Sequence, residues 1–293
     1  MVYIVSRKLF KHSIQIDKMT NVIKILFLGD IVGRPGRQVV KDYLANISDA
    51  DRFDFVIANA ENASHGFGLT EKNHNELISL GINCLTSGNH IWDKREVFKY
   101  ISNSQVLIRP LNYPENTPGA GVRIFELDSC KIAVINLLGR TFMNPVDSPW
   151  EVIQKEIEKI REVTPVIFVD FHAEATAEKI CFGKFCSELG VSAVVGTHTH
   201  IQTADEKIIN NKTAYITDAG FCGDANGVIG MDYKTSLRRL VTSLPERFDV
   251  SESEETQLNG VSITVDFNTG CALNIERINF VKSNNEVIMM TKG

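Results

Sequence analysis

The sequence predicts an α/β fold built around a large mixed β-sheet, and two observations support this. Short continuous apolar runs alternate with segments whose apolar residues recur at helical spacing, which is typical of strands buried between helices. Metal-binding types of side chain directly follow several of these runs, as they do at the carboxyl edge of an α/β sheet. The chain has 293 residues, 43% apolar and 23% charged, an ordinary composition for a globular protein.

The predicted elements follow one another from residue 22 onward. Residues 22–29 form a continuous apolar run ending in Gly29-Asp30, and the helix after it has an apolar face made of Val39, Val40, Tyr43, Leu44 and Ile47. Further apolar runs predict strands at 55–58, 84–87, 106–109, 122–127, 131–138, 165–169, 191–195 and 213–216. Helical spacing marks 77–80, ended by Gly81, and 150–161. Residues 261–290 contain two turn signals and predict two or three antiparallel strands.

The chain shows no internal division. No repeat, low-complexity tract or linker interrupts it, so residues 19–293 are predicted to form a single domain. Met19 stands just before the first strand, and residues 1–18 are expected to be a solvated N-terminal extension. Their apolar start is broken at once by Arg7 and Lys8, which leaves too short a stretch for a secretory signal.

Charge and cysteine usage exclude several classes of protein. There are 31 Lys+Arg against 36 Asp+Glu, a formal charge of −5 without a basic block. This argues against strong binding to nucleic-acid duplexes but not against a small phosphorylated substrate. No apolar stretch approaches the about 20 residues of a membrane span. The six scattered cysteines lack a C-x-x-C pair and are expected to be reduced thiols in the cytoplasm. A homo-oligomer is left open.

Side chains able to bind a metal follow five of the predicted strands. The carboxyl ends of such strands share one rim, so we expect one cluster of Asp30, Glu61, Asn62, Asn89, His90, His172, His198 and His200. Each residue alone has an ordinary explanation, because an Asp after Gly caps helices and a lone histidine can be a hydrogen-bonded core residue. Together, carboxylate, amide and imidazole groups suit a first-row transition metal.

The size of this set indicates two metal ions. A catalytic zinc has about three protein ligands, fewer than are present here. A carboxylate such as Glu61 can bridge two cations about 3.5–4 Å apart. The net positive charge that remains favours a bridging hydroxide and an anionic substrate, so hydrolysis of a phosphate ester is the chemistry that fits best.

Other reactive residues carry weaker signals. His74 falls in the polar part of a helix and is expected at the surface. His65 is interpreted as a solvated loop residue, with substrate contact as the alternative. Covalent catalysis by Cys222 is disfavoured, because no nucleophile elbow surrounds it and a buried thiol is the commoner state. No P-loop motif is present.

Seven stretches spread over about residues 22–290 resemble one family. They are 29–37 (GDIVGRPGR), 59–63 (NAENA), 86–93 (TSGNHIWD), 109–114 (RPLNYP), 170–176 (DFHAEAT), 196–205 (GTHTHIQTAD) and 217–220 (TDAG). The chain thereby resembles the YmdB-like group of bacterial calcineurin-type metallophosphoesterases, known as 2′,3′-cyclic nucleotide 2′-phosphodiesterases. The resemblance implies a four-layer sandwich in which helices flank two mixed β-sheets.

The resemblance also implies roles for the clustered residues. There would be two metal ions, iron or manganese, and both would bind Glu61. The first ion would also be held by Asp30, Asn62 and His200. The second would also be held by Asn89, His172 and His198. His90 would be the general acid that protonates the leaving oxygen. The implied reaction is hydrolysis of 2′,3′-cyclic nucleotides to 3′-nucleotides by attack of a metal-bridging hydroxide. Residues that bind the rest of the substrate are not identified.

Two alternative functions are compatible with the same site residues. The wider superfamily shows Asp-x-His after the first strand and Gly-Asp after the second, whereas this chain has Asp30-Ile31-Val32 and Glu61-Asn62. Substrate range therefore does not transfer from ordinary phosphoprotein phosphatases. A phosphomonoesterase or phosphoprotein phosphatase with the same residues is one alternative. The other is a low-turnover nucleotide-binding regulatory protein, against which the complete ligand set with His90 argues.

Overall fold

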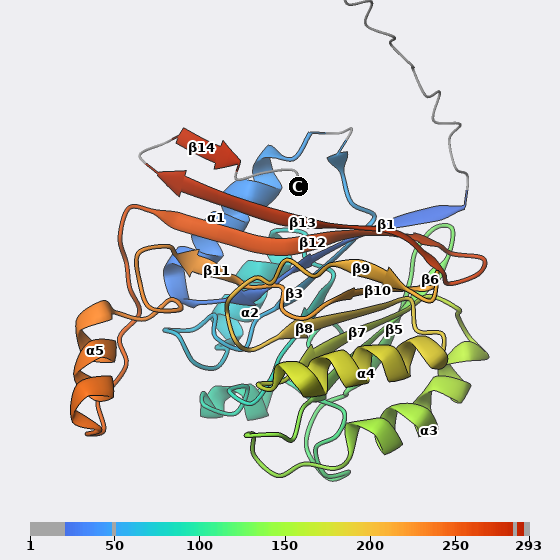
Figure 1. The fold of residues 1–293 in the computed structure, drawn as a ribbon, viewed down its shortest axis with the longest axis horizontal. Helices are drawn as coiled ribbons and strands as arrows, with labels where there is room; N and C mark the ends of the chain where they lie inside the picture. Colours follow the sequence, from blue (N-terminus) through green and yellow to red (C-terminus); the bar gives the residue numbers. More distant parts are fainter. Residues whose placement is uncertain (1–20, 49–50, 284–285, 290–293) are drawn as a thin grey trace, which may run out of the picture.

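The computed structural model describes residues 21–48, 51–283 and 286–289, so the predicted extension 1–18 lies outside the described residues. Two mixed β-sheets lie face to face, with helices on their outer sides (Figure 1). This confirms the α/β class and the four-layer sandwich. The apolar runs alone predicted one large sheet. The strands divide between two sheets because a strand covered by another sheet needs the same apolar side chains as one covered by helices.

The first sheet joins the two ends of the described chain. Its main order is β14 (Glu286–Met289), β13 (Ala272–Ser283), β12 (Thr256–Asp266), β1 (Val22–Leu28), β3 (Phe55–Asn59) and β4 (Cys84–Thr86). Off this path, β11 (Phe221–Asp224) pairs with β12 and with the short β2 (Asp30–Ile31). The β1, β3 and β4 strands are parallel, whereas β12, β13 and β14 are antiparallel, as predicted for the tail.

The second sheet is parallel at its centre. Its order is β5 (Val122–Glu126), β6 (Lys131–Leu138), β7 (Ile167–His172), β8 (Ala193–Thr197), β10 (Thr213–Ile216) and β9 (Lys207–Ile209). The inner four strands are parallel, and β5 and β9 close the two edges in antiparallel pairing.

Each outer layer is a pair of helices. The first sheet carries α1 (Gly33–Asn46) and α2 (Glu71–Ser79), and the second carries α3 (Pro149–Arg161) and α4 (Thr176–Glu188). Hydroxyl groups of Thr70 and Ser148 cap α2 and α3, where they accept hydrogen bonds from backbone N–H groups. The α5 helix (Tyr233–Thr242) stands apart from these layers, and η2 (Arg95–Lys99) is a short 3-10 helix (Figure 1). None of the helices described is long and apolar enough to cross a membrane.

Three apolar layers hold the sandwich together. Between the sheets, Phe27 and Phe168 stack with ring centroids 5.3 Å apart and join β1 to β7. Outside the first sheet, Val40 of α1 and Leu77 of α2 are fully buried, and outside the second, Phe182 of α4 is fully buried. Each such side chain contributes about 1.5–3 kcal/mol through burial.

Two further sequence predictions are wrong. Residues 106–109 form only an isolated bridge, Leu85 with Leu107, because the Arg109 N–H turns away to Ala120 and the following proline has no N–H to continue a ladder. His74 is buried, not at the surface, since it packs against Tyr100 and lies 3.0 Å from the Ser104 hydroxyl. The segment that covers His74, which contains Tyr100 and Ser104, is distant in sequence, so the residue pattern of the helix could not predict this burial.

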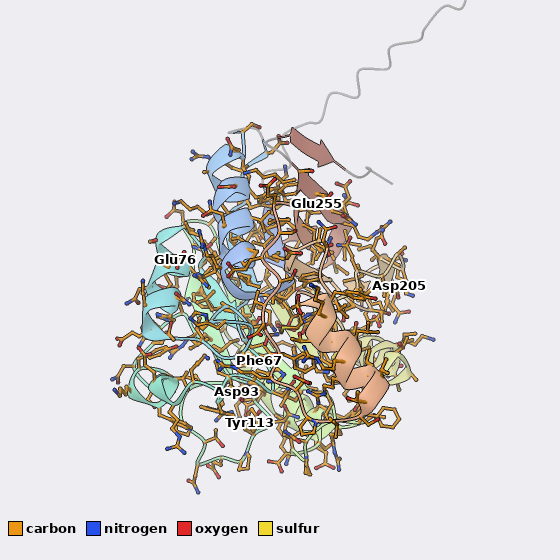
Figure 2. The ribbon with its side chains drawn as sticks, turned by 90° about the vertical axis from the view of Figure 1, so that its left-hand side faces the viewer. Phe67, Glu76, Asp93, Tyr113, Asp205 and Glu255 are labelled. Atoms are coloured by element: carbon orange, nitrogen blue, oxygen red, sulfur yellow. The ribbon has the colours of Figure 1, made fainter. Side chains whose placement is uncertain are left out.

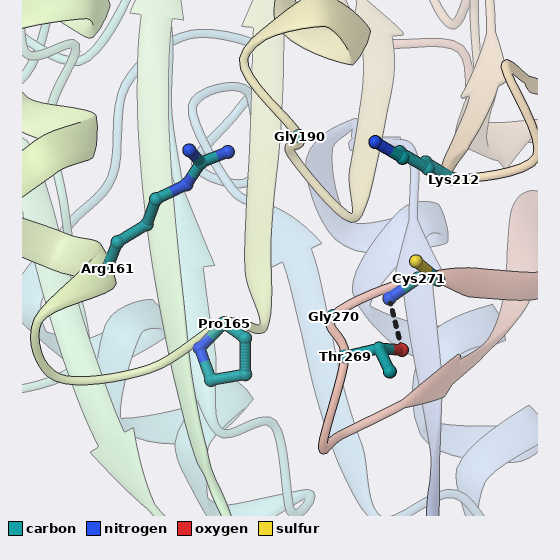
Figure 3. A pocket seen from close by; sticks show the side chains of 7 residues that line it. All are labelled: Arg161, Pro165, Gly190, Lys212, Thr269, Gly270 and Cys271. Atoms are coloured by element: carbon teal, nitrogen blue, oxygen red, sulfur yellow. Dashed lines mark hydrogen bonds between the residues drawn. The ribbon is translucent and has the colours of Figure 1, made fainter.

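The parallel strands of both sheets end at one edge and begin at the other. At the edge where they begin, the β12–β13 turn closes against the second sheet, where the Ala272 N–H donates to the Lys212 carbonyl at 2.7 Å. A hollow of about 290 Å³ opens there, lined by Arg161, Pro165, Gly190, Lys212, Thr269, Gly270 and Cys271 (Figure 3). The side chains of Arg161 and Lys212 approach from opposite walls, with the ends of both turned toward Gly190 (Figure 3).

Candidate functional site

The opposite edge brings together all of the predicted site residues. Asp30 begins β2 directly after β1, and His172 is the last residue of β7. The others stand in the turns after β3, β4 and β8, namely Glu61, Asn62, Asn89, His90, His198 and His200. Asp30, Glu61 and His172 are fully buried. Residues up to 170 positions apart thus meet at one rim, because the turns follow neighbouring parallel strands.

One half of the cluster centres on His172. Its Nε2 lies 2.9 Å from Glu61 Oε1, 3.1 Å from Asn89 Oδ1 and 3.0 Å from His198 Nδ1. Glu61, His172 and His198 each offer a ligand atom within 4.8 Å of the others. Four donor groups from both sheets therefore converge on a common point, as a metal site requires.

The other half of the cluster centres on His200. Its Nε2 lies 3.6 Å from Asp30 Oδ1 and 3.3 Å from Asn62 Nδ2. The same Asn62 amide lies 3.4 Å from Glu61 Oε1. Glu61 therefore contacts both halves, which is the position that a shared ligand must occupy.

Two oxygens show that these residues fit metal ions. Asp30 Oδ1 and Asn62 Oδ1 are buried without a hydrogen-bond partner among the described residues. Leaving such an acceptor unsatisfied costs about 1–3 kcal/mol each. A cation between them would satisfy both oxygens, and mixed oxygen and imidazole donors suit a first-row transition metal.

The charges in the cluster shift the pKa values of its members. Burial by itself raises the pKa of Asp30, but the neighbouring His200 and His172 outweigh it, so that the pKa falls well below the usual range. Burial lowers the pKa of His172, whereas Glu61 and Asp30 raise it more, to about 9. Burial and the charge on His172 lower the pKa of His198 to about 3. The carboxylates of Glu61 and Asp30 thus favour the protonated form of His172. A cation replaces this proton when the imidazole becomes a metal ligand.

Residues behind the cluster orient its imidazoles. His172 Nδ1 donates to the Thr197 hydroxyl at 2.9 Å, and this hydroxyl donates to Asp170 Oδ1 at 2.6 Å. His198 Nε2 lies 3.0 Å from Glu174, and His200 Nδ1 donates to the Ile229 carbonyl at 2.9 Å. Such partners select the tautomer that leaves the other ring nitrogen free for a metal.

Sequence reasoning missed these orienting residues. Asp170 is fully buried inside β7, and burial raises its pKa to about 7. A carboxylate in a buried strand, two positions before a candidate ligand, is the signal that could have found it. Asp218 was also missed. It pairs with buried Lys179 at 2.7 Å and accepts the Thr199 N–H and hydroxyl, which holds the turn between His198 and His200.

The backbone around the candidate ligands is tightly constrained. His198 and His200 have φ values of 98° and 64°, a region that non-glycine residues rarely adopt and that clusters at functional sites. A Cβ on Gly88 would lie 2.4 Å from the His172 ring and 2.5 Å from Glu61 Oε2. The turn after β4 can therefore approach the cluster only because this position is glycine.

His90 lies beside the cluster and keeps one ring nitrogen available. Its backbone N–H donates to Glu61 Oε2 at 2.8 Å, and its Nδ1 lies 2.9 Å from Asp93 Oδ2. The Phe67 ring packs edge-on against it, with centroids 4.9 Å apart. Phe67 and Asp93 lie close together on the face shown in Figure 2. The His90 side chain is 31% exposed, so it can reach a molecule in solvent.

The other singled-out residues have ordinary environments. His65 is exposed, as expected for a loop residue, and it lines a hollow outside the cluster together with Lys94 and Phe248. Cys222 is fully buried, and burial raises its pKa to about 12. A thiol in this state is neutral and inaccessible, which agrees with the interpretation against covalent catalysis.

The two-sheet fold and its rim of candidate metal ligands are those of a metallophosphoesterase-type protein. A family model described as YmdB-like protein matches residues 26–278, and the chain belongs to this family. It is 48% identical to the 2′,3′-cyclic-nucleotide 2′-phosphodiesterase of Bacillus subtilis, covering 87% of this chain and 96% of that protein.

Two solved structures share the fold throughout. One is a novel phosphatase from Mycoplasma pneumoniae, with a TM-score of 0.84 and 37% identity over 90% of this chain and 95% of that one. The other is a hypothetical protein from Thermus thermophilus, with a TM-score of 0.82 and 33% identity over 89% of this chain and 100% of that one.

Proposed function

We propose that the protein is a metal-dependent phosphodiesterase that hydrolyses 2′,3′-cyclic nucleotides to 3′-nucleotides. The observation that carries this proposal is the convergence of Asp30, Glu61 and three imidazoles on one rim, with His90 poised beside them. The name of the Bacillus subtilis relative supports the choice of substrate. The cytoplasm is the proposed compartment, consistent with six free cysteines.

The metal-binding roles follow the two halves of the cluster. Asp30, Asn62 and His200 would hold one ion and Asn89, His172 and His198 the other, with Glu61 shared between them. Two buried oxygens without partners support this assignment. When bound, iron or manganese ions supply positive charge to the phosphoryl oxygens and lower the pKa of an attacking water.

His90 would act as the general acid. Asp93 accepts the Nδ1 proton at 2.9 Å, so the proton on Nε2 is the one available to the substrate. The hydrogen bond from the His90 backbone to Glu61 fixes its distance from the ligands. Transfer of the Nε2 proton to the departing 2′ oxygen leaves the phosphate on the 3′ oxygen.

The test is turnover of 2′,3′-cyclic AMP by purified protein, with and without added Mn²⁺ and with the product isomer identified by chromatography. We expect 3′-AMP. Formation of 2′-AMP would contradict the role of His90. Absence of turnover by protein that carries two metal ions would contradict the substrate, and activity on phosphomonoesters alone would then favour the phosphatase alternative.

A further inference from the structure

A second hollow lies near His90, from which the Phe67 ring separates it. It has a volume of about 380 Å³ and is lined by His65, Lys94, Arg247, Phe248, Asp249, Val250 and Glu252. This volume falls in the range of small-ligand sites. None of these residues belongs to the metal cluster.

Direct packing connects this hollow to the reaction site. The Phe67 ring lies 4.9 Å from His90 on one side and 6.3 Å from Phe248 on the other, measured between centroids. Lys94 follows Asp93, the partner of His90. A Cβ on Gly68 would lie 2.8 Å from the Lys94 backbone nitrogen, so the loop that carries Phe67 packs closely on this segment. The hollow is thus one aromatic ring away from His90.

The geometry of the proposed substrate leads toward the hollow. His90 would protonate the 2′ oxygen, which is attached to ribose C2′. The nucleobase is attached to the neighbouring carbon, C1′, so it projects from the His90 side of the ribose. The hollow is the nearest candidate for this base, because only the Phe67 ring separates its Phe248 wall from His90, with centroid distances of 4.9 Å to His90 and 6.3 Å to Phe248.

The charges of the hollow suit a neutral polar ligand. Lys94 and Arg247 are balanced by Asp249 and Glu252, and none of these four side chains has a hydrogen-bond or ion-pair partner among the described residues. A phosphate group would meet two carboxylates as well as two cations and would gain little net attraction. A nucleobase offers acceptors to the cations and donors to the carboxylates in the plane of its ring.

We propose that this hollow is the nucleobase subsite and that it selects guanine; the proposal rests on the cyclic phosphodiesterase function above. Lysine and arginine donate to the O6 and N7 acceptors of guanine, and carboxylates accept from its N1–H and amino group. Adenine has no carbonyl acceptor, and uracil has a single donor. Phe248 and Val250 supply an apolar wall, and Arg239 packs over the Phe248 ring at 4.5 Å and holds it in place.

The experiment compares kcat/KM for the four 2′,3′-cyclic nucleotides with that for bis(p-nitrophenyl) phosphate, a diester without a base. In the metal-loaded wild-type protein, we expect cyclic GMP to exceed cyclic UMP by about tenfold. Arg247→Ala and Asp249→Asn should each lower the ratio of cyclic GMP to bis(p-nitrophenyl) phosphate activity by about tenfold, mainly through KM. The matched control Lys99→Ala, an exposed cation of η2 outside the hollow, should keep the wild-type ratio.

The outcomes separate the subsite from the proposed function. Equal kcat/KM for all four bases, or an unchanged ratio in both hollow variants, would overturn the subsite while the phosphodiesterase function stands. If the loaded protein hydrolyses no diester, the function fails, and calorimetric binding of 3′-GMP then tests the hollow directly. Weaker binding to Arg247→Ala than to wild type would support the subsite, and equal binding would overturn it.

Discussion

The two ends of the parallel strands differ in whether their polar side chains are buried or exposed. Where the parallel strands end, Asp30, Glu61 and His172 are fully buried. Where they begin, Arg161 and Lys212 are exposed, and neither has an ion-pair or hydrogen-bond partner among the described side chains. An unpaired cation in water costs nothing, whereas an unpaired buried oxygen costs stability. The buried oxygens Asp30 Oδ1 and Asn62 Oδ1, which lack partners among the described residues, therefore distinguish this edge from the one with exposed cations.

Removing Glu61, the ligand proposed to be shared by both halves of the cluster, should have the largest effect. Glu61→Ala is expected to lose both metal ions and to reduce turnover by about a thousandfold or more, because metal chemistry drives the reaction. Metal content by mass spectrometry and turnover of 2′,3′-cyclic AMP measure this. Full occupancy of two ions in the variant would disprove the bridging role.

Removing the proposed acid should separate chemistry from metal binding. His90→Ala is expected to keep both ions and to lose about 10²–10⁴-fold in kcat, because this side chain donates a proton and binds no metal. The same two measurements apply. Near-wild-type turnover would show that another group protonates the leaving oxygen.

A change behind the ligands should have an intermediate effect. Asp170→Asn alters the carboxylate that accepts from Thr197, the partner of His172, and should weaken metal affinity by about 10–100-fold. Titration of the metal-free protein with Mn²⁺ measures this affinity. Unchanged affinity would mean that Thr197 orients His172 without the carboxylate.

The opposite edge should tolerate substitution. Arg161→Ala and Lys212→Ala are expected to change the free energy of unfolding by no more than about 0.5 kcal/mol, as exposed side chains usually do. Urea denaturation measures this, and turnover should equal that of wild type. A large loss of activity in either variant would break the contrast between the two edges.

Local sequence patterns predicted much of the fold. The apolar runs at 131–138 and 213–216 coincide with β6 and β10, because a strand buried on both faces needs a continuous apolar segment. The pattern failed at 106–109, where the direction of one N–H and a proline end the pairing. It also could not show whether helices or a second sheet covers a strand, since both require the same side chains.

The site shows the same division between local and long-range information. The positions of Glu61 and His172 directly after or at the end of apolar runs sufficed to predict that they meet, because strand ends share an edge. The pairing of Asp93 with His90, the chain from Asp170 through Thr197 to His172, and the hollow beside Phe248 were not predictable in this way. They depend on distances between side chains from distant segments, which are set by packing in three dimensions and leave no periodic signal in the sequence.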